Sequence, residues 1–180
     1  MQEGGRPAFR IRLALAATLS PAYGIYNGFE LCENTPIRGR EEYLNSEKYE
    51  YKVWDWDRAG NIKDDIRALN RFRRDNPALQ EFTNLRFLSC PDPEILAYLK
   101  ISTDRANTVI VVVNLDPHAV HTADVELPLA ELGLAEGQMF SLEEAFGRNV
   151  ATCRGPRQQF RLDPATNPAL IFRLQRSETK

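Results

Sequence analysis

The chain has 180 residues, a formal net charge of −2, and contents of 43% hydrophobic and 27% charged residues. This composition is typical of a soluble globular protein and excludes a disordered one. The near-neutral charge gives no electrostatic reason to expect nucleic acid or an acidic membrane as a partner. No apolar run reaches the ~18 residues that a membrane-spanning helix needs, and the N-terminus lacks a secretory signal. We therefore expect a cytoplasmic protein.

The three cysteines, Cys32, Cys90 and Cys153, are dispersed and show no C-x-x-C spacing. An odd, scattered set argues for a reducing compartment and against a disulfide framework or a zinc site. The motifs G-x-S-x-G, G-x-G-x-x-G and G-x-x-x-x-G-K-[ST] are all missing from the sequence. Serine-hydrolase, dinucleotide and P-loop functions therefore have no local support, and we expect neither a metal nor an organic cofactor.

The first predicted element is a helix over residues 6–20, because Ala and Leu dominate after Pro7 and Pro21 ends the segment. The helical spacing places Arg6, Arg10 and Arg12 on the outward face. The next stretch, "AYGIYNG" (22–28), is short and largely apolar. It predicts a strand buried on both faces, as in a parallel sheet.

A long irregular connection rich in Glu, Asn, Tyr and Trp follows over residues 31–60. A loop of this length in a compact protein is usually functional or disordered, and its aromatic residues argue against disorder. A second helix is predicted over 62–75, with Asn61 as its cap, acidic residues in the first turn and arginines in the last. Asn76-Pro77 ends that helix.

The β-rich half begins after residue 80, where short apolar runs alternate with Pro, Asp, Asn and Gly. This spacing predicts an antiparallel sandwich or barrel, with "NTVIVVVNL" (107–115) as a central strand. We place a domain boundary near residues 77–83, which divides the chain into 1–80 and 81–180. One parallel-type strand between two helices cannot form a sheet alone, so the first half predicts the end of a larger α/β domain.

Four loop carboxylates are candidates for glycoside hydrolysis, which uses a pair of them: Glu30, Glu33, Asp55 and Asp57. The competing interpretation is that they accept backbone N–H bonds or pair with arginines, and sequence spacing favours it. His118 and His121 flank a predicted turn without a third ligand nearby, which favours exposed histidines over a metal site.

The segment "EEYLNSEKYEYKVWDWD" (41–57) has the chemistry of a carbohydrate subsite, where rings cover sugar faces and polar groups bind hydroxyls. The alternative is that its aromatic residues fix the loop to the body of the protein, with Trp54 and Trp56 the strongest candidates for that role. For Lys48 and Tyr49 the residue pattern alone leaves both interpretations open.

Two blocks carry a resemblance to a known family: "SPAYGIYNGFELCEN" and "NSEKYE", within a longer similar stretch over residues 3–115. The sequence resembles the C-terminal part of bacterial α-1,4-glucan:maltose-1-phosphate maltosyltransferase, a glycoside hydrolase of the α-amylase superfamily. The resemblance implies the last helix, strand and helix of a (β/α)8 TIM barrel in residues 1–80. It implies an α-amylase-type C-terminal β-sandwich domain in residues 81–180, and a loop 31–60 on the catalytic face.

The same resemblance implies retaining transfer of maltosyl units from maltose 1-phosphate to α-1,4-glucan, a step of glycogen biosynthesis. Lys48 and Tyr49 match the pair that helps to hold the donor disaccharide. The catalytic carboxylates match no residue of this chain, so we expect no catalytic residue here and no catalysis by the chain alone. We expect a homodimer for the full-length enzyme, and either the missing barrel part or self-association to cover the helices.

Two other functions stay open at this point. One is a non-catalytic carbohydrate-binding or structural module built on the β-sandwich. The other is part of a different hydrolase, or of a trehalose-forming enzyme, of the same superfamily.

Overall fold

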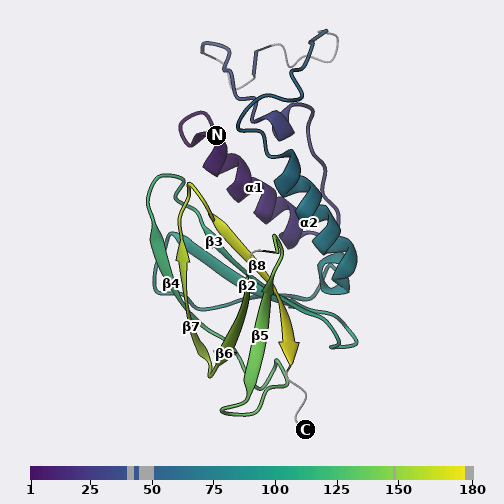
Figure 1. Ribbon diagram of the computed structural model, residues 1–180, viewed down its shortest axis with the longest axis vertical. Helices are drawn as coiled ribbons and strands as arrows, with labels where there is room; N and C mark the ends of the chain where they lie inside the picture. Colours follow the sequence, from purple (N-terminus) through teal and green to yellow (C-terminus); the bar gives the residue numbers. More distant parts are fainter. Residues whose placement is uncertain (40–42, 45–50, 148, 177–180) are drawn as a thin grey trace.

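The computed structural model describes residues 1–39, 43–44, 51–147 and 149–176. Two α-helices, α1 (Gly5–Leu19) and α2 (Lys63–Asp75), lie together beside the strands (Figure 1). Two short 3-10 helices, η1 (Phe29–Leu31) and η2 (Pro77–Gln80), flank the loop and α2. The strands are β1 (Leu85–Phe87), β2 (Ile95–Ile101), β3 (Thr108–Asn114), β4 (His121–Glu126), β5 (Met139–Glu144), β6 (Val150–Arg154), β7 (Arg157–Leu162) and β8 (Ala169–Arg176).

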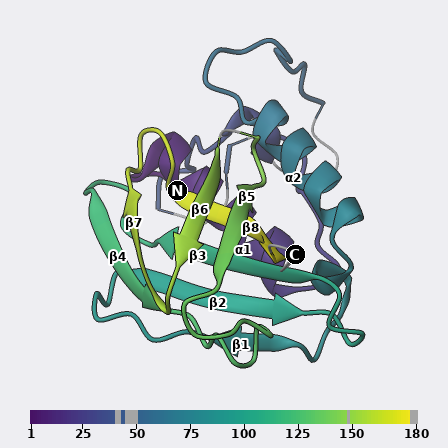
Figure 2. The same ribbon diagram turned by 60° about the horizontal axis from the view of Figure 1, so that its bottom comes forward.

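The strands form an antiparallel sandwich, as the spacing of the apolar runs predicts. Six of them make one sheet in the order β1-β2-β3-β8-β5-β6, and β4 pairs with β7 in a second, two-stranded sheet. Figure 2 shows the β4–β7 pair beside the larger sheet. The sequence did not predict β6, whose five residues are mostly exposed and carry no continuous apolar run.

The predicted central strand is confirmed in β3, all seven residues of which are buried. Its middle residue, Val111, lies opposite Tyr98 of β2 on one side and Ile171 of β8 on the other. Pairing on both edges satisfies the backbone N–H and C=O groups of β3, and apolar contacts cover both of its faces.

Two apolar clusters cover the two faces of the large sheet. One contains Phe9 and Ala17 of α1, Leu69 of α2, and Val111 and Ile171 of the sheet. The other fills the space between the opposite sheet face and the β4–β7 pair. The helices therefore share a core with the β-rich half, and the predicted domain boundary near 77–83 stays a prediction.

One polar contact crosses from α1 to the sheet inside this core. The hydroxyls of Thr18 and Tyr98 lie 2.6 Å apart, and the Thr18 hydroxyl also donates to the carbonyl of Ala14 at 2.6 Å. Both residues are fully buried. The contact satisfies two hydroxyls that would otherwise lose their hydration without replacement.

The predicted strand over residues 22–28 was wrong, because these residues form no strand in the structure. Ile25 and Tyr26 are 39% and 67% exposed, where a strand buried on both faces would hide them. A strand needs a neighbour for its backbone hydrogen bonds, and none of the described strands lies in this half of the chain. Apolar composition alone therefore did not make this segment a strand.

The two predicted helices are present, with one correction to their polar faces. Asn61 Oδ1 accepts the Lys63 N–H at 3.2 Å, so its predicted capping role at the start of α2 is confirmed. Arg12 is exposed as predicted, but Arg10 is buried, with only 6% of its surface accessible. Arg10 is buried because its guanidinium forms an ion pair with Asp65 of α2 inside the protein.

Candidate functional site

The predicted substrate loop, residues 31–60, is described by its two ends. The first end runs from η1 to residue 39, with residues 43–44, and the second covers residues 51–60 and leads into α2. We call these ends the two stems of the loop. Lys48 and Tyr49, the predicted donor-binding pair, lie outside the described residues. For this site, the structure therefore describes the two stems.

Glu33 joins the two stems through its carboxylate. On the first stem, Oε1 accepts the Thr35 N–H at 3.2 Å and the Thr35 hydroxyl at 2.8 Å. On the second stem, Oε2 lies 3.2 Å from Lys52 Nζ and 3.3 Å from Arg58 Nη1. Only 14% of the Glu33 side chain is accessible. These contacts match the interpretation of a structural carboxylate that accepts an N–H bond and pairs with an arginine.

The same contacts keep Glu33 ionised. Its partial burial disfavours the charged form and acts to raise the pKa. The hydrogen bonds from the Thr35 side chain and backbone, together with Lys52, outweigh burial and lower the pKa to about 2. Glu33 is therefore a fixed negative charge at neutral pH, which does not suit a general acid.

Trp54 and Gly28 make a second connection between the stems. Gly28 has a φ of 90°, and a β-carbon at this position would lie 2.5 Å from Trp54 Cη2. Only glycine allows both this backbone conformation and so close a ring. Lys52 Nζ lies 4.4 Å from the centre of the Trp54 ring, at cation–π distance. Trp54 therefore packs between the two stems, in the manner of the alternative in which aromatic residues hold the loop in place.

Trp56 does not share that role, because its residue is 49% exposed. Its backbone carbonyl accepts a hydrogen bond from Lys63 Nζ, and the same ammonium lies 3.7 Å from Asp57 Oδ1. The Asp57 side chain is fully accessible. Asp55 Oδ1 accepts the Asp57 N–H at 3.1 Å, a contact typical of a turn. These two carboxylates thus organise turns of the second stem.

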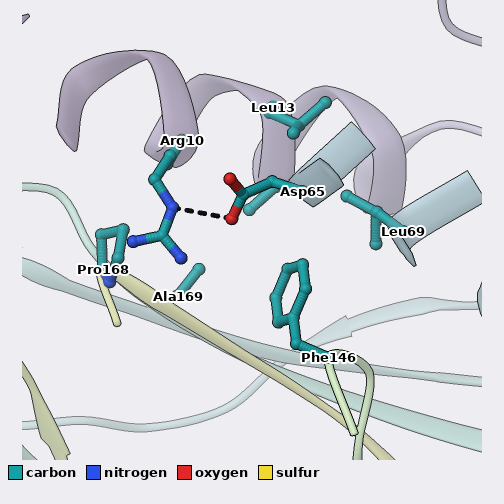
Figure 3. A pocket seen from close by; sticks show the side chains of 8 residues that line it. Arg10, Leu13, Asp65, Leu69, Phe146, Pro168 and Ala169 are labelled. Carbon is teal, nitrogen blue, oxygen red and sulfur yellow. Dashed lines mark hydrogen bonds and ion pairs between the residues drawn. The ribbon is translucent and has the colours of Figure 1, made fainter. Parts of the chain in front are cut away.

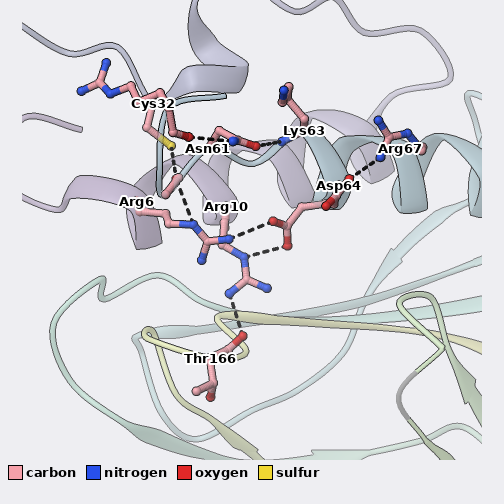
Figure 4. A network of polar contacts seen from close by, with 11 residues as sticks. Arg6, Arg10, Cys32, Asn61, Lys63, Asp64, Arg67 and Thr166 are labelled. Atoms are coloured by element: carbon pink, nitrogen blue, oxygen red, sulfur yellow. Dashed lines mark hydrogen bonds and ion pairs between the residues drawn. The ribbon is translucent and has the colours of Figure 1, made fainter. Parts of the chain in front are cut away.

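An ion-pair network, buried at Arg10 and Asp65, joins the helices to the sandwich. Asp65 accepts from Arg10 Nε at 2.9 Å and from Arg6 Nη2 at 3.1 Å. Arg10 Nη1 reaches the Thr166 carbonyl at 2.6 Å, and Arg6 Nε donates to the Gly60 carbonyl at 3.1 Å. Figure 4 shows how the two guanidiniums connect α1, α2 and the segment between β7 and β8.

Apolar side chains surround this network. Arg10 and Asp65 lie in a small pocket with Leu13, Leu69 and Phe146, between the helices and the start of β8 (Figure 3). Such surroundings exclude water and strengthen the attraction between the two charges. This buried ion pair therefore fixes the position of α2, and with it the end of the second stem, which leads into α2.

Cys32 lies beside the same network. Its thiol is 3.6 Å from the Gly60 carbonyl, and burial raises its pKa, which favours the unreactive thiol over the thiolate. Cys32 also packs against the apolar cluster that the helices share with the sheet. The Ile62 N–H donates to the Glu30 carbonyl at 2.8 Å, so η1 is also attached to the start of α2.

Both histidines were expected to be exposed, and only one of them is. His118 is exposed, but the His121 side chain is 19% accessible and its Nδ1 lies 2.6 Å from Asp92 Oδ2. Its Nε2 lies 3.5 Å from Asp116 Oδ2, and the hydrogen bond with Asp92 raises the His121 pKa. Over residues 1–39, 43–44, 51–147 and 149–176, no three His, Cys, Asp or Glu residues converge to hold a metal ion.

Within the part of the chain that the structure describes, none of the helices has the length and apolar character required to cross a membrane.

Sequence comparison connects this chain to enzymes of α-glucan metabolism. Residues 87–174 match the protein family described as "GLGE, C-terminal". The chain is 54% identical over 174 residues to the α-1,4-glucan:maltose-1-phosphate maltosyltransferase of Rhodospirillum rubrum, covering 97% of the chain and 25% of that relative. The enzyme of the same name from Myxococcus xanthus is 42% identical over 180 residues, covering 99% and 27%. The chain thus spans about a quarter of the length of the curated relatives it matches.

Solved structures share the fold at low sequence identity. A maltogenic alpha-amylase from Thermotoga neapolitana matches 96% of this chain with a TM-score of 0.64 and 15% identity, using 37% of its own chain. An alpha-amylase from Geobacillus thermoleovorans, complexed with acarbose, matches 96% with a TM-score of 0.62 and 18% identity, using 34%. The sequence matches place the chain in the family of the α-1,4-glucan:maltose-1-phosphate maltosyltransferases, as a relative of their C-terminal part.

Proposed function

We propose that this chain forms the C-terminal portion of a retaining glycosyltransferase that moves maltosyl units from maltose 1-phosphate to α-1,4-glucan. The observation that supports this most is the extent of the match to the Rhodospirillum rubrum maltosyltransferase. It covers 97% of the chain and therefore includes most of the helical part with its loop, in addition to the β-rich residues 87–174. A likeness confined to the sandwich would support only a common accessory module.

In this proposal, α1 and α2 are the last two outer helices of a catalytic (β/α)8 barrel, and residues 22–28, which form no strand in this chain, connect them to the loop on the catalytic face. The exposure of Ile25 and Tyr26 supports this assignment, since the rest of a barrel would cover these apolar side chains. About three quarters of each relative lies outside the matched region, which is room enough for the rest of that barrel.

The loop 31–60 then lies at the face where barrel enzymes bind their substrates. Lys48 and Tyr49 are assigned to the donor, maltose 1-phosphate, with the ammonium close to its charged or hydroxyl groups and the ring against a sugar face. The firmly held stems support this role, because a substrate-binding loop needs a fixed base.

Retaining transfer passes through a covalent glycosyl–enzyme intermediate on a carboxylate, with a second carboxyl group as acid and then base. The contacts of Glu33 and Asp57 do not suit these roles, which supports assigning them to residues outside this chain. We therefore expect no maltosyl transfer by the 180-residue chain alone. The full-length homodimer and the cytoplasmic location belong to the same proposal.

The experiment is a chimera of the Rhodospirillum rubrum enzyme in which the region aligned with this chain is replaced by residues 1–180. Phosphate release from maltose 1-phosphate is measured with glycogen as the acceptor. We expect activity from the chimera and none from the 180-residue chain. In the chimera, Lys48→Ala is expected to raise the KM for maltose 1-phosphate, while Arg12→Ala, an exposed cation on α1, leaves it unchanged.

Transfer or phosphate release by the purified 180-residue chain would contradict the proposal, as would an inactive but folded chimera. Titration of the 180-residue chain with maltose and glycogen tests the carbohydrate-binding module. Saturable binding that survives Lys48→Ala would favour that module over the donor loop.

A further inference from the structure

We propose that Glu33 is a positioning residue, whose carboxylate holds the two stems of the loop together and thereby sets the affinity for the donor. The inference rests on the proposed function for its effect on substrate, but the connection between the stems is a property of this chain alone. Glu33 itself contacts no substrate in this proposal. It acts through the segment between the stems, which carries Lys48 and Tyr49.

The first stem is built around the backbone of Glu33. Its N–H donates to the Gly28 carbonyl at 3.0 Å, directly after η1. Its Oε1 holds Thr35 by both N–H and hydroxyl, and the Thr35 carbonyl accepts the Leu44 N–H at 2.8 Å. One carboxylate oxygen thus fixes a chain of contacts that ends at residue 44.

The second stem is held by the other oxygen. Lys52 Nζ and Arg58 Nη1 both approach Oε2, at 3.2 Å and 3.3 Å, from positions six residues apart. Lys52 also lies over the ring of Trp54, which packs on Gly28. Two cations and one aromatic ring of the second stem therefore converge on a short stretch of the first.

Chain continuity connects this clamp to the predicted donor-binding pair. Lys48 is four residues after Leu44 and four residues before Lys52. The two stems that Glu33 joins are therefore the attachments of the chain on either side of the pair. Release of either stem removes one of these two attachments. We expect the loss as weaker donor binding, because a site that is less preorganised has to be ordered when the donor binds.

A glutamine cannot replace this carboxylate. It keeps one acceptor oxygen but presents an NH₂ group on the other side, which would face either the Thr35 donors or the two cations. Glu33→Gln therefore breaks the contacts to one stem while changing the side-chain volume little. Glu33→Asp keeps the charge and both acceptors but is one methylene shorter, so we expect a smaller effect.

The first test uses the 180-residue chain and does not depend on the reaction. Limited digestion with trypsin, well below the unfolding temperature, is followed by mass spectrometry at each cleaved Lys or Arg. We expect Glu33→Gln to increase cleavage after Arg38, Lys48, Lys52 and Arg58 by about tenfold, the factor for ~1.4 kcal/mol. Glu126→Gln, which replaces an exposed carboxylate on β4, should change nothing. Unchanged cleavage, or equal acceleration at sites outside residues 31–60, would overturn the clamp.

The second test uses the chimera. Glu33→Gln is expected to raise the KM for maltose 1-phosphate about tenfold with kcat changed less than about twofold, because the lost interaction acts on donor binding. Glu33→Asp should lie between wild type and Glu33→Gln. A lowered kcat with an unchanged KM would overturn the positioning role. An inactive wild-type chimera would count against the proposed function, while the digestion would still decide whether Glu33 holds the stems.

Discussion

Arg10 and Asp65 form a buried ion pair, with 2.9 Å between Nε and Oδ1, that joins the first helix to the second. Both side chains are less than 10% accessible, and they come from positions 55 residues apart. Arg10 also donates to the Thr166 carbonyl, so the pair connects both helices to the turn between β7 and β8. The position of α2, and with it the second stem of the loop, depends on this contact.

Removal of one partner should therefore be costly. Asp65→Asn leaves the Arg10 guanidinium buried without its counter-charge, and we expect the free energy of unfolding to fall by about 3–5 kcal/mol. Asp64→Asn is the matched control, because Asp64 pairs with Arg67 on the helix surface, where ion pairs contribute below about 1 kcal/mol. Urea denaturation of both variants measures the difference, and equal losses would contradict the account.

Gly28 offers a test of the contact between the stems. Gly28→Ala places a β-carbon 2.5 Å from Trp54 in a left-handed backbone conformation. Gly60→Ala has nearly the same φ, 79°, but nothing within 4 Å of the added carbon. We expect Gly60→Ala to cost about 1–2 kcal/mol from backbone strain alone, and Gly28→Ala about 1–3 kcal/mol more from overpacking.

A double variant separates these two causes. In a Trp54→Ala background, the excess cost of Gly28→Ala over Gly60→Ala should disappear, since the ring that it meets is gone. Thermal unfolding of the four variants and their parent gives the comparison. An excess that persists without the indole would show that the cost does not come from this contact.

His121 should make stability depend on pH. Its hydrogen bond with Asp92 raises the His121 pKa above 6.5, burial opposes this rise, and Asp116 adds to it. A histidine with a raised pKa stabilises the folded state fully below its unfolded pKa, near 6.5, and loses that contribution as pH rises through the folded value. The unfolding midpoint of wild type should exceed that of His121→Gln most at pH 5–6. The excess should shrink above pH 7 and be smaller in an Asp92→Asn background, where Asp116 alone raises the His121 pKa.

The contact between Thr18 and Tyr98 tests how α1 is attached to the sheet. Tyr98→Phe removes one buried hydroxyl, while Thr18 keeps its bond to the Ala14 carbonyl. We expect a loss of about 1 kcal/mol in the free energy of unfolding, with one cooperative transition for helices and strands together. Far-UV circular dichroism follows the helices and strands together, and the fluorescence of Trp54 and Trp56 follows the loop that leads into α2. Separate midpoints would contradict a shared core.

The sequence predicted well those elements that depend on local composition. A stretch of about eight residues is enough to predict β3, which is apolar throughout, and the neighbouring strands, which turns delimit. Asn61 and the acidic first turn likewise predict the start of α2. β6 was missed, because a mostly exposed edge strand has no apolar pattern to recognise.

The errors arise where a residue's state depends on a distant partner. Helical spacing placed Arg10 outward, and no local signal shows that Asp65 would pair with it inside the protein. Residues 22–28 have the composition of a buried strand, but a strand exists only with its neighbours. In the candidate site, the sequence favoured a structural role for Glu33 and offered a packing role for Trp54. It did not predict that both residues would lie against Gly28.

The rate of phosphate release from maltose 1-phosphate, with glycogen as acceptor, tests the central claim most directly when it is measured on the Rhodospirillum rubrum chimera. If this chain supplies the end of the barrel and the donor loop, the chimera should keep kcat/KM within about tenfold of the parent enzyme, or ~1.4 kcal/mol of transition-state stabilisation. A chimera that folds with a single sharp transition but releases no phosphate would contradict the claim.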